Sequence, residues 1–278
     1  MAFAQLNSRV LVTIVGAPIV LCCVYFGNWP FLIFIAAIFV LSLREFFELS
    51  KNKGVVPNLL ISIIAGLLLL YDMYFSRGEY FIPIISVYLV LISILQLWET
   101  RGSQIQNLSV NFFAVGYLGM LLSFFVGIRQ LPLDLNIDYN QGGIWAITIL
   151  AIFWIGDTIA YFVGSSIGKH KLATRVSPKK TIEGAIAGFI SMLMVAYLSK
   201  MLFLPEWSWL DATVIGVICG TVGQMSDLVE SLFKRDAGVK DTSNILLGHG
   251  GIFDRFDVLF LVSPLIFFYL KYFSSVSH

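Results

Sequence analysis

Long uncharged apolar segments constrain this chain more than any other feature. Of its 278 residues, 58% are hydrophobic and 13% are charged, whereas a soluble domain has about 25% charged residues. The apolar residues form continuous blocks rather than stripes along one helix face, and a helix needs about 20 such residues to cross a bilayer. The sequence therefore predicts an all-α integral membrane protein.

Polar turns divide the apolar sequence into about nine predicted transmembrane helices. We expect these spans at 10–27, 30–48, 57–75, 81–98, 108–128, 143–164, 182–203, 209–229 and 256–273. The first block lacks a small-x-small cleavage site and other spans follow it directly, so it is interpreted as a retained transmembrane helix rather than a signal peptide. We expect residues 1–140 to serve as scaffold, lipid access or dimer contact, and residues 141–278 to form the catalytic transmembrane region.

The distribution of Lys and Arg predicts the orientation of these spans. Fourteen of the 18 Lys and Arg residues fall on one side of the predicted membrane, and an excess of positive charge marks the cytoplasmic side. Nine of the fourteen lie in only two segments, 165–181 and 230–255. Topology alone needs fewer charges, so we expect cytoplasmic active-site loops there, although charges that anchor helix ends are the alternative.

Charge and cysteine content exclude several function classes. The formal net charge is +1 and there is no basic tail, so no nucleic-acid partner is expected. Cys22, Cys23 and Cys219 lie in apolar segments without CxxC or Cys/His spacing. They are interpreted as packing residues rather than disulfides or metal ligands.

The segment 153–188 contains the first group of candidate site residues. Asp157 is placed near the inner end of a span, where a charge is costly, and Tyr161 follows four residues later on the same helix face. Ser177-Pro178 predicts a helix start with Thr181 just inside the helix. Lys179 and Lys180 beside free backbone N–H groups would then form an anion site; the alternative is an interfacial Lys pair with charged ends in water.

The segment 223–257 contains two acidic pairs with i, i+3 spacing. Asp227 and Glu230 lie toward the end of the span 209–229, where acids are unfavourable for the helix dipole. Asp254 and Asp257 lie at the start of the last span, where the dipole itself favours acids. Carboxylates on two helix ends facing basic loops predict a divalent cation site, and hard oxygen ligands suit Mg²⁺.

The segment GHGG between these pairs adds a candidate phosphate contact. Its glycines, Gly250 and Gly251, would let the backbone approach a phosphate, with His249 as a proton donor or acid. We expect one reactant to be a membrane lipid, since two water-soluble reactants would not need nine spans. Arg44, Glu45 and Glu48 are interpreted as a charged helix end without a site role.

A longer pattern in the second half resembles a known family. The sequence resembles the signature of the phosphatidate cytidylyltransferases, also called CDP-diacylglycerol synthases, at Ser231-x-Phe233-Lys234-Arg235, Lys240-Asp241-x-Ser243 and His249-Gly250-Gly251-x-x-Asp254-Arg255-x-Asp257. The segments GDTIAYFVG and SPKKTIEG are also similar to motifs of that family.

The resemblance implies an activity, cofactors and partners. The implied reaction joins CTP and phosphatidic acid to give CDP-diacylglycerol and pyrophosphate. It also implies dependence on Mg²⁺, with K⁺ as a candidate second cation, and a homodimer in the bacterial inner membrane with the active site facing the cytoplasm.

The resemblance and the residue pattern together give the candidate site residues, and the resemblance implies that Lys179, Lys180, Lys234 and Arg235 contact phosphates. Asp227 and Asp254 are the implied metal ligands, and Glu230 and Asp257 are further candidates. Catalytic candidates besides these two aspartates are Lys234, Arg235 and His249. Candidate contacts to substrate or phosphate are Ser177, Lys179, Lys180, Thr181, Asp157, Tyr161, Lys240, Asp241, Gly250, Gly251 and Arg255.

Two alternatives remain open from the residues. A cation-coupled transporter would use Asp157 and Asp227 as ion ligands, but transporters usually show internal repeats with polar sites in both halves. Here the polar residues concentrate in the second half. The other alternative is a related nucleotidyltransferase that acts on another lipid phosphate.

Overall fold

Helices make up most of the described chain. The computed structural model describes residues 14, 16–243 and 250–277. Within them, seven helical segments are long and apolar enough to cross a membrane, namely Asn28–Lys51, Leu59–Ser76, Phe81–Trp98, Gln104–Asp134, Tyr139–Ile167, Ile182–Leu202 and Trp209–Asp236. This confirms an all-α membrane protein with several apolar spans.

The seven helices correspond to the second through eighth predicted spans. The predicted first span lies partly outside the described residues, and its described part contains a shorter apolar helix, Gly16–Phe26. The last predicted span is helix α11, Phe253–Tyr272, which has four charged residues and is not among the seven. The total of nine spans and their orientation stay predictions.

The chain folds as two compact units. The first comprises Met1–Gly127 and Phe233–Phe256, and the second comprises Ile128–Leu232 and Asp257–His278. The chain passes from one unit to the other inside three helices, which are α6 (Leu121–Asp134), α10 (Gln224–Asp236) and α11. The expected division of roles at residue 140 stays a prediction.

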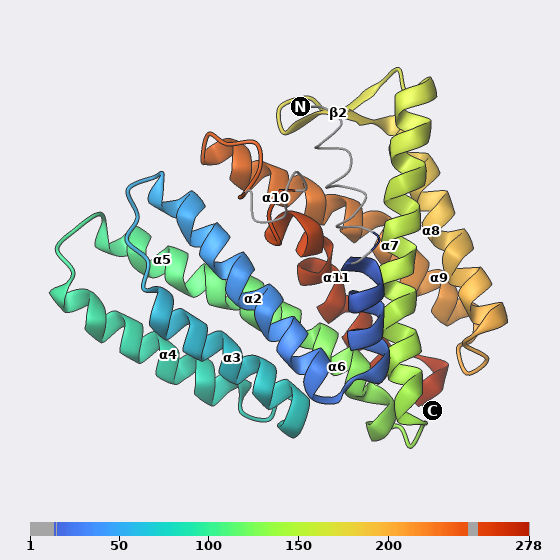
Figure 1. The fold of residues 1–278 in the computed structure, drawn as a ribbon, viewed down its shortest axis with the longest axis horizontal. Coiled ribbons are helices and arrows are strands. Elements are labelled where there is room, and N and C mark those ends of the chain that lie inside the picture. The colour runs from blue at the N-terminus through green and yellow to red at the C-terminus, as the bar shows by residue number, and fades with distance from the viewer. Residues whose placement is uncertain (1–13, 15, 244–249, 278) are drawn as a thin grey trace. The chain divides into compact units, whose positions relative to one another are not determined.

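Most of the first unit consists of four neighbouring helices, α2 (Asn28–Lys51), α3 (Leu59–Ser76), α4 (Phe81–Leu95) and α5 (Gln104–Ala114) (Figure 1). A 3₁₀ turn, η1, follows α4 at Gln96–Trp98. Buried apolar side chains of α3 and α4 pack together, including Leu69, Tyr88 and Ile92. The Tyr88 hydroxyl lies 2.9 Å from Ser62 Oγ, so the unit also has a hydrogen-bonded polar interior.

The second unit is built around α7 (Tyr139–Ile167), α8 (Ile182–Leu202) and α9 (Trp209–Ile218) (Figure 1). Glycines allow α7 and α8 to approach closely, because a Cβ on Gly184 would lie only 3.0 Å from the Gly164 Cα. Small residues at such crossings are common between membrane helices. At the other end, Asp211 of α9 accepts a 2.8 Å hydrogen bond from the Tyr269 hydroxyl of α11. A final 3₁₀ turn, η4, covers Ser275–Ser277.

Two long helices contain a π-helical segment. Segment η2, Val115–Met120, joins α5 to α6, and η3, Cys219–Gly223, joins α9 to α10. Single π-turns inside α-helices often accompany functional sites. The second one directly precedes Gln224 and Asp227, and the hydrophobic periodicity did not predict it.

The predicted helix start at Ser177-Pro178 is wrong. Strand β2, Ser177–Thr181, pairs antiparallel with β1, Lys171–Ala173, and the helix begins only at Ile182. Thr181 is the N-cap, and its hydroxyl accepts a 3.2 Å hydrogen bond from Gly184 N–H. The hairpin therefore places Ser177, Lys179 and Lys180 on a strand, because Thr181 caps the helix in place of Ser177.

Candidate active site

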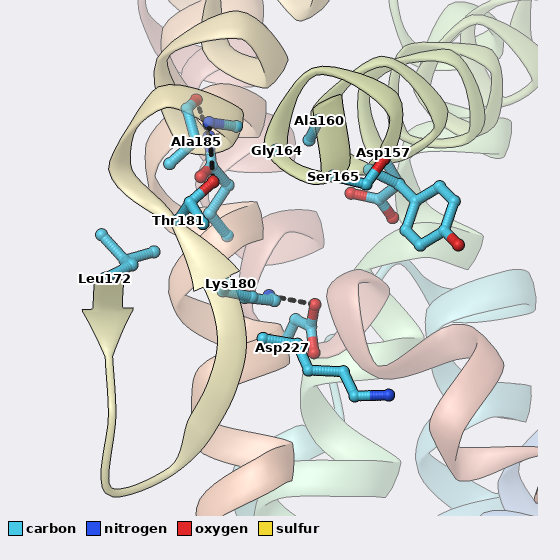
Figure 2. A pocket seen from close by; sticks show the side chains of 13 residues that line it. Asp157, Ala160, Gly164, Ser165, Leu172, Lys180, Thr181, Ala185 and Asp227 are labelled. Carbon is cyan, nitrogen blue, oxygen red and sulfur yellow. Dashed lines mark hydrogen bonds and ion pairs between the residues drawn. The ribbon is translucent and has the colours of Figure 1, made fainter. Parts of the chain in front are cut away.

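A pocket in the second unit collects many of the predicted site residues. Its volume is about 470 Å³, within the range of small-molecule sites. Helix α7, the hairpin, α8 and α10 supply its lining residues, which are Asp157, Ala160, Tyr161, Gly164, Ser165, Leu172, Lys179, Lys180, Thr181, Gly184, Ala185, Gln224 and Asp227. Figure 2 shows Asp157, Lys180 and Asp227 bordering the same space.

The basic strand and the acidic helix meet in this pocket. Lys180 Nζ forms an ion pair with the Asp227 carboxylate, drawn as a dashed line in Figure 2. Lys180 also interacts electrostatically with Asp157 and Asp257. Lys179, its neighbour on the strand, is exposed at the pocket edge. The pocket thus combines an anion-attracting wall with carboxylates.

Gln224 fixes the start of α10 beside the pocket. Its side-chain amide donates to the carbonyl of Gly220 at 2.8 Å and to that of Ala185 at 3.0 Å. The first carbonyl belongs to the π-segment and the second to α8. This contact links the helix that carries Asp227 to the helix that follows the basic strand.

Three carboxylates of the second unit gather within metal-binding distance. One oxygen each of Asp227, Glu230 and Asp257 lies within 4.8 Å of the other two. Glu230 and Asp257 are buried, and Asp227 is half-buried. Three acids so close repel one another unless cations compensate their charge. The all-oxygen donor set, without His or Cys, fits Mg²⁺ rather than zinc.

The first unit holds Asp254 in different surroundings. Asp254 Oδ1 lies 2.9 Å from Lys234 Nζ, and both side chains are about one-tenth exposed. Asp254 Oδ2 accepts hydrogen bonds from the Gly251 backbone N–H at 2.7 Å and from Thr242 N–H at 3.2 Å. Asp254 and Lys234, both catalytic candidates, are therefore brought together.

The glycines of the GHGG segment lie against carboxylates. A Cβ on Gly250, whose φ is +79°, would lie 2.5 Å from Asp254 Oδ2. A Cβ on Gly251 would collide with the Thr242 hydroxyl and the Glu45 carboxylate. Only glycine fits this turn, and its role as a phosphate contact stays a prediction. His249 lies outside the described residues.

Other predicted site residues lie at the surface of the units. Arg235 donates from a guanidinium nitrogen to the Val239 carbonyl at 2.9 Å, which closes the end of α10. Lys240, Asp241 and Arg255 are exposed. Ser177 pairs with Ala173 in the hairpin and is not among the residues that line the pocket.

The interpretation of Glu45 as part of a charged helix end is wrong. Glu45 is 2% exposed, and its carboxylate accepts hydrogen bonds from Thr242, Ser243, Ile252 and Phe253. The signal in the sequence was an acid beside Phe46 and Phe47 in an apolar helix, because a buried charge needs partners. These partners lie about 200 residues away, so the sequence could not name them.

Comparison with known proteins assigns the chain to a family. A sequence model of the cytidylyltransferase family matches residues 7–273. A phosphatidate cytidylyltransferase from Bacillus subtilis is 34% identical over 97% of this chain and 99% of its own length. A protein of the same name from Synechocystis is 30% identical over 95% of this chain and 96% of its own length. The chain therefore belongs to the cytidylyltransferase family.

Proposed function

We propose that this membrane enzyme transfers a cytidylyl group from CTP to phosphatidic acid, giving CDP-diacylglycerol and pyrophosphate. The relatives named phosphatidate cytidylyltransferase support this substrate pair. The observation that carries the proposal is the pocket in which Lys180 meets Asp227 beside two further carboxylates. Such a site can hold phosphate groups and a divalent cation next to each other.

The bonding changes follow from the two substrates. A phosphate oxygen of the lipid forms a bond to the α-phosphorus of CTP, and the bond from that phosphorus to the α–β bridging oxygen breaks. Pyrophosphate leaves with the bonding electrons. Because the attacking oxygen is already anionic, the site needs no strong general base, and catalysis depends on positioning and charge neutralisation.

The residues of the second unit supply this neutralisation in the proposal. Asp227, Glu230 and Asp257 would hold Mg²⁺, which would offset phosphate charge and orient the reacting groups. Lys179 and Lys180 would contact the phosphates from the strand, and their place in the pocket lining supports this role. Asp157 and Tyr161 border the same pocket from α7. Asp254, which the family resemblance implies as a metal ligand, is proposed to take part in the reaction as an ion pair with Lys234.

Localisation and assembly complete the proposal. The positive residues of segments 165–181 and 230–255 support a cytoplasmic face for the site, as the distribution of charge in membrane proteins predicts. The family resemblance supports a bacterial inner-membrane homodimer and K⁺ as a second cation.

The decisive assay measures pyrophosphate release by purified protein in micelles. We expect release only when both CTP and phosphatidic acid are present, and we expect Asp227→Asn to lower kcat by about 10²–10³-fold. Glu48→Gln is the control, since Glu48 is an exposed acid paired with Lys51 at 2.6 Å. Near-normal turnover in Asp227→Asn would contradict the site assignment.

Two further arms of the assay separate the alternatives. Release with a polyprenyl phosphate but not with phosphatidic acid would favour the other lipid substrate. Ion uptake by vesicles that contain the protein, without pyrophosphate release, would favour the transporter.

A further inference from the structure

We propose that Glu45 is a positioning residue that orients Asp254 for the reaction by fixing the backbone on both sides of residues 244–249. The proposal rests on the proposed function above. Glu45 belongs to α2, far in sequence from every predicted site residue, and it does not need to touch a substrate.

The Glu45 carboxylate joins α2 to two separate backbone segments. Oε1 accepts from Ser243 Oγ at 2.6 Å and from Ile252 N–H at 3.0 Å. Oε2 lies 3.1 Å from the Thr242 hydroxyl and accepts from Phe253 N–H at 2.8 Å. Hydrogen bonds to a carboxylate are stronger than those between neutral groups. One buried side chain therefore holds residues 242–243 and the first turn of α11.

Asp254 shares this support through Thr242 and Gly251. The Thr242 hydroxyl lies 3.1 Å from Glu45 Oε2 and 3.1 Å from Asp254 Oδ2, and its single hydrogen can be donated to only one of them at a time. Gly251 N–H donates to Asp254 Oδ2 at 2.7 Å, while Gly251 itself packs against Glu45. A shift of Glu45 therefore changes two of the residues that hold Asp254, while the ion pair with Lys234 does not involve Glu45.

The charge of Glu45 distinguishes it from ordinary loop anchors in the same unit. Asn107 Oδ1 accepts from Val56 N–H at 2.8 Å, and Asn111 Oδ1 accepts from Asn58 N–H at 2.9 Å. Neutral amides thus anchor that loop. A buried carboxylate has a larger desolvation cost than an amide, but both of its oxygens accept hydrogen bonds here, whereas an amide has only one accepting oxygen. The negative charge of Glu45 lies beside the positive N-terminal end of α11, where Asp254 must keep its orientation toward Lys234.

The test compares Glu45→Gln and Glu45→Asp with Glu48→Gln on the same helix. Purified full-length protein is assayed with CTP and phosphatidic acid, and hydrogen exchange is measured at the amides of Ile252 and Phe253. We expect Glu45→Gln to lower kcat by about 100-fold, as small misplacements in an active site do, with an unchanged KM for CTP. Glu45→Asp should recover part of kcat, and exchange at both amides should quicken in Glu45→Gln.

A second pair of variants covers the case in which Glu45→Gln does not fold. Thr242→Val removes the hydroxyl shared by the two acids, and Thr242→Ser keeps it. We expect kcat to fall about tenfold in Thr242→Val, a loss of one hydrogen bond to a charged group, and to stay near wild type in Thr242→Ser. Equal kcat in these two variants would overturn the proposal.

The outcomes separate this proposal from the proposed function. A wild-type protein that releases no pyrophosphate from CTP and phosphatidic acid refutes the proposed function, and the exchange data then decide the role of Glu45. Unchanged protection of Ile252 and Phe253 in Glu45→Gln overturns the positioning role. A kcat in Glu45→Gln equal to the kcat in Glu48→Gln would also overturn the positioning role.

Discussion

The two units treat their buried acids differently. In the first, Glu45 and Asp254 accept hydrogen bonds from backbone N–H groups at the start of α11 and lie within hydrogen-bond distance of the hydroxyls of Thr242 and Ser243. In the second, Asp227, Glu230 and Asp257 face one another within 4.8 Å. An acid surrounded by donors orders its backbone, whereas acids gathered together favour binding of a cation. In the proposed function, the carboxylates of the first unit would position backbone groups, and those of the second would hold the cation that neutralises phosphate charge.

The largest effect should come from removing one acid of the gathered group. We expect Asp257→Asn to weaken binding of Mn²⁺, a probe for Mg²⁺, by about 10- to 100-fold, because one of the three proposed carboxylate ligands is lost. Electron paramagnetic resonance of free Mn²⁺ measures this binding without turnover. Glu48→Gln is the control. An unchanged Mn²⁺ affinity in Asp257→Asn would mean that the three gathered acids do not bind a cation, and the contrast with the hydrogen-bonded acids of the first unit would be lost.

A smaller effect is expected at the basic wall of the pocket. Lys179→Ala should raise the apparent KM for CTP by about tenfold, since a contact between a charged donor and phosphate contributes about 1.5–3 kcal/mol. Lys171→Ala is the matched control, because Lys171 is exposed on the partner strand of the same hairpin. Initial rates over a range of CTP concentrations measure both. If the KM for CTP rose equally in Lys179→Ala and Lys171→Ala, the proposed contact between Lys179 and a phosphate of CTP would be wrong.

The smallest effect is expected for Glu99, a half-buried acid whose partner Arg101 is exposed. The Arg101 guanidinium, hydrogen-bonded to Glu99 at 2.9 Å, lowers the pKa of that carboxyl to about 2. A lowered pKa gives a stabilisation that is present above the ordinary pKa and is lost as the pH falls toward 2. An ion pair with one exposed partner is screened by water and contributes little, so Glu99→Gln should leave activity and thermal unfolding unchanged at pH 7. A large loss of activity or thermal stability in Glu99→Gln would mean that burial does not distinguish the acids needed for activity from the other acids.

Hydropathy predicted most of the fold because the bilayer imposes it. Spans such as 30–48 and 182–203 correspond to observed helices, since an apolar segment of this length must satisfy its backbone groups internally. The hairpin was missed because Ser177-Pro178 has the composition of a helix start, and only the structure shows that Thr181 caps α8 instead.

The site was predictable where neighbours in sequence are neighbours in space. Asp227 and Glu230, or Asp157 and Tyr161, lie on one helix face and were paired from their spacing. The contacts of Lys180 with Asp227 and of Glu45 with Phe253 join distant segments. Spacing along one helix contains no information about such pairs.

The π-helical segment at Cys219–Gly223 has a consequence for how this helix can change. A π-helical turn contains more residues than an α-helical turn, so this segment sets the direction in which Asp227 and Glu230 point relative to the side chains of α9. The number of residues between Ile218 and Gln224 therefore determines whether these two acids meet Asp257 while α9 keeps its apolar packing.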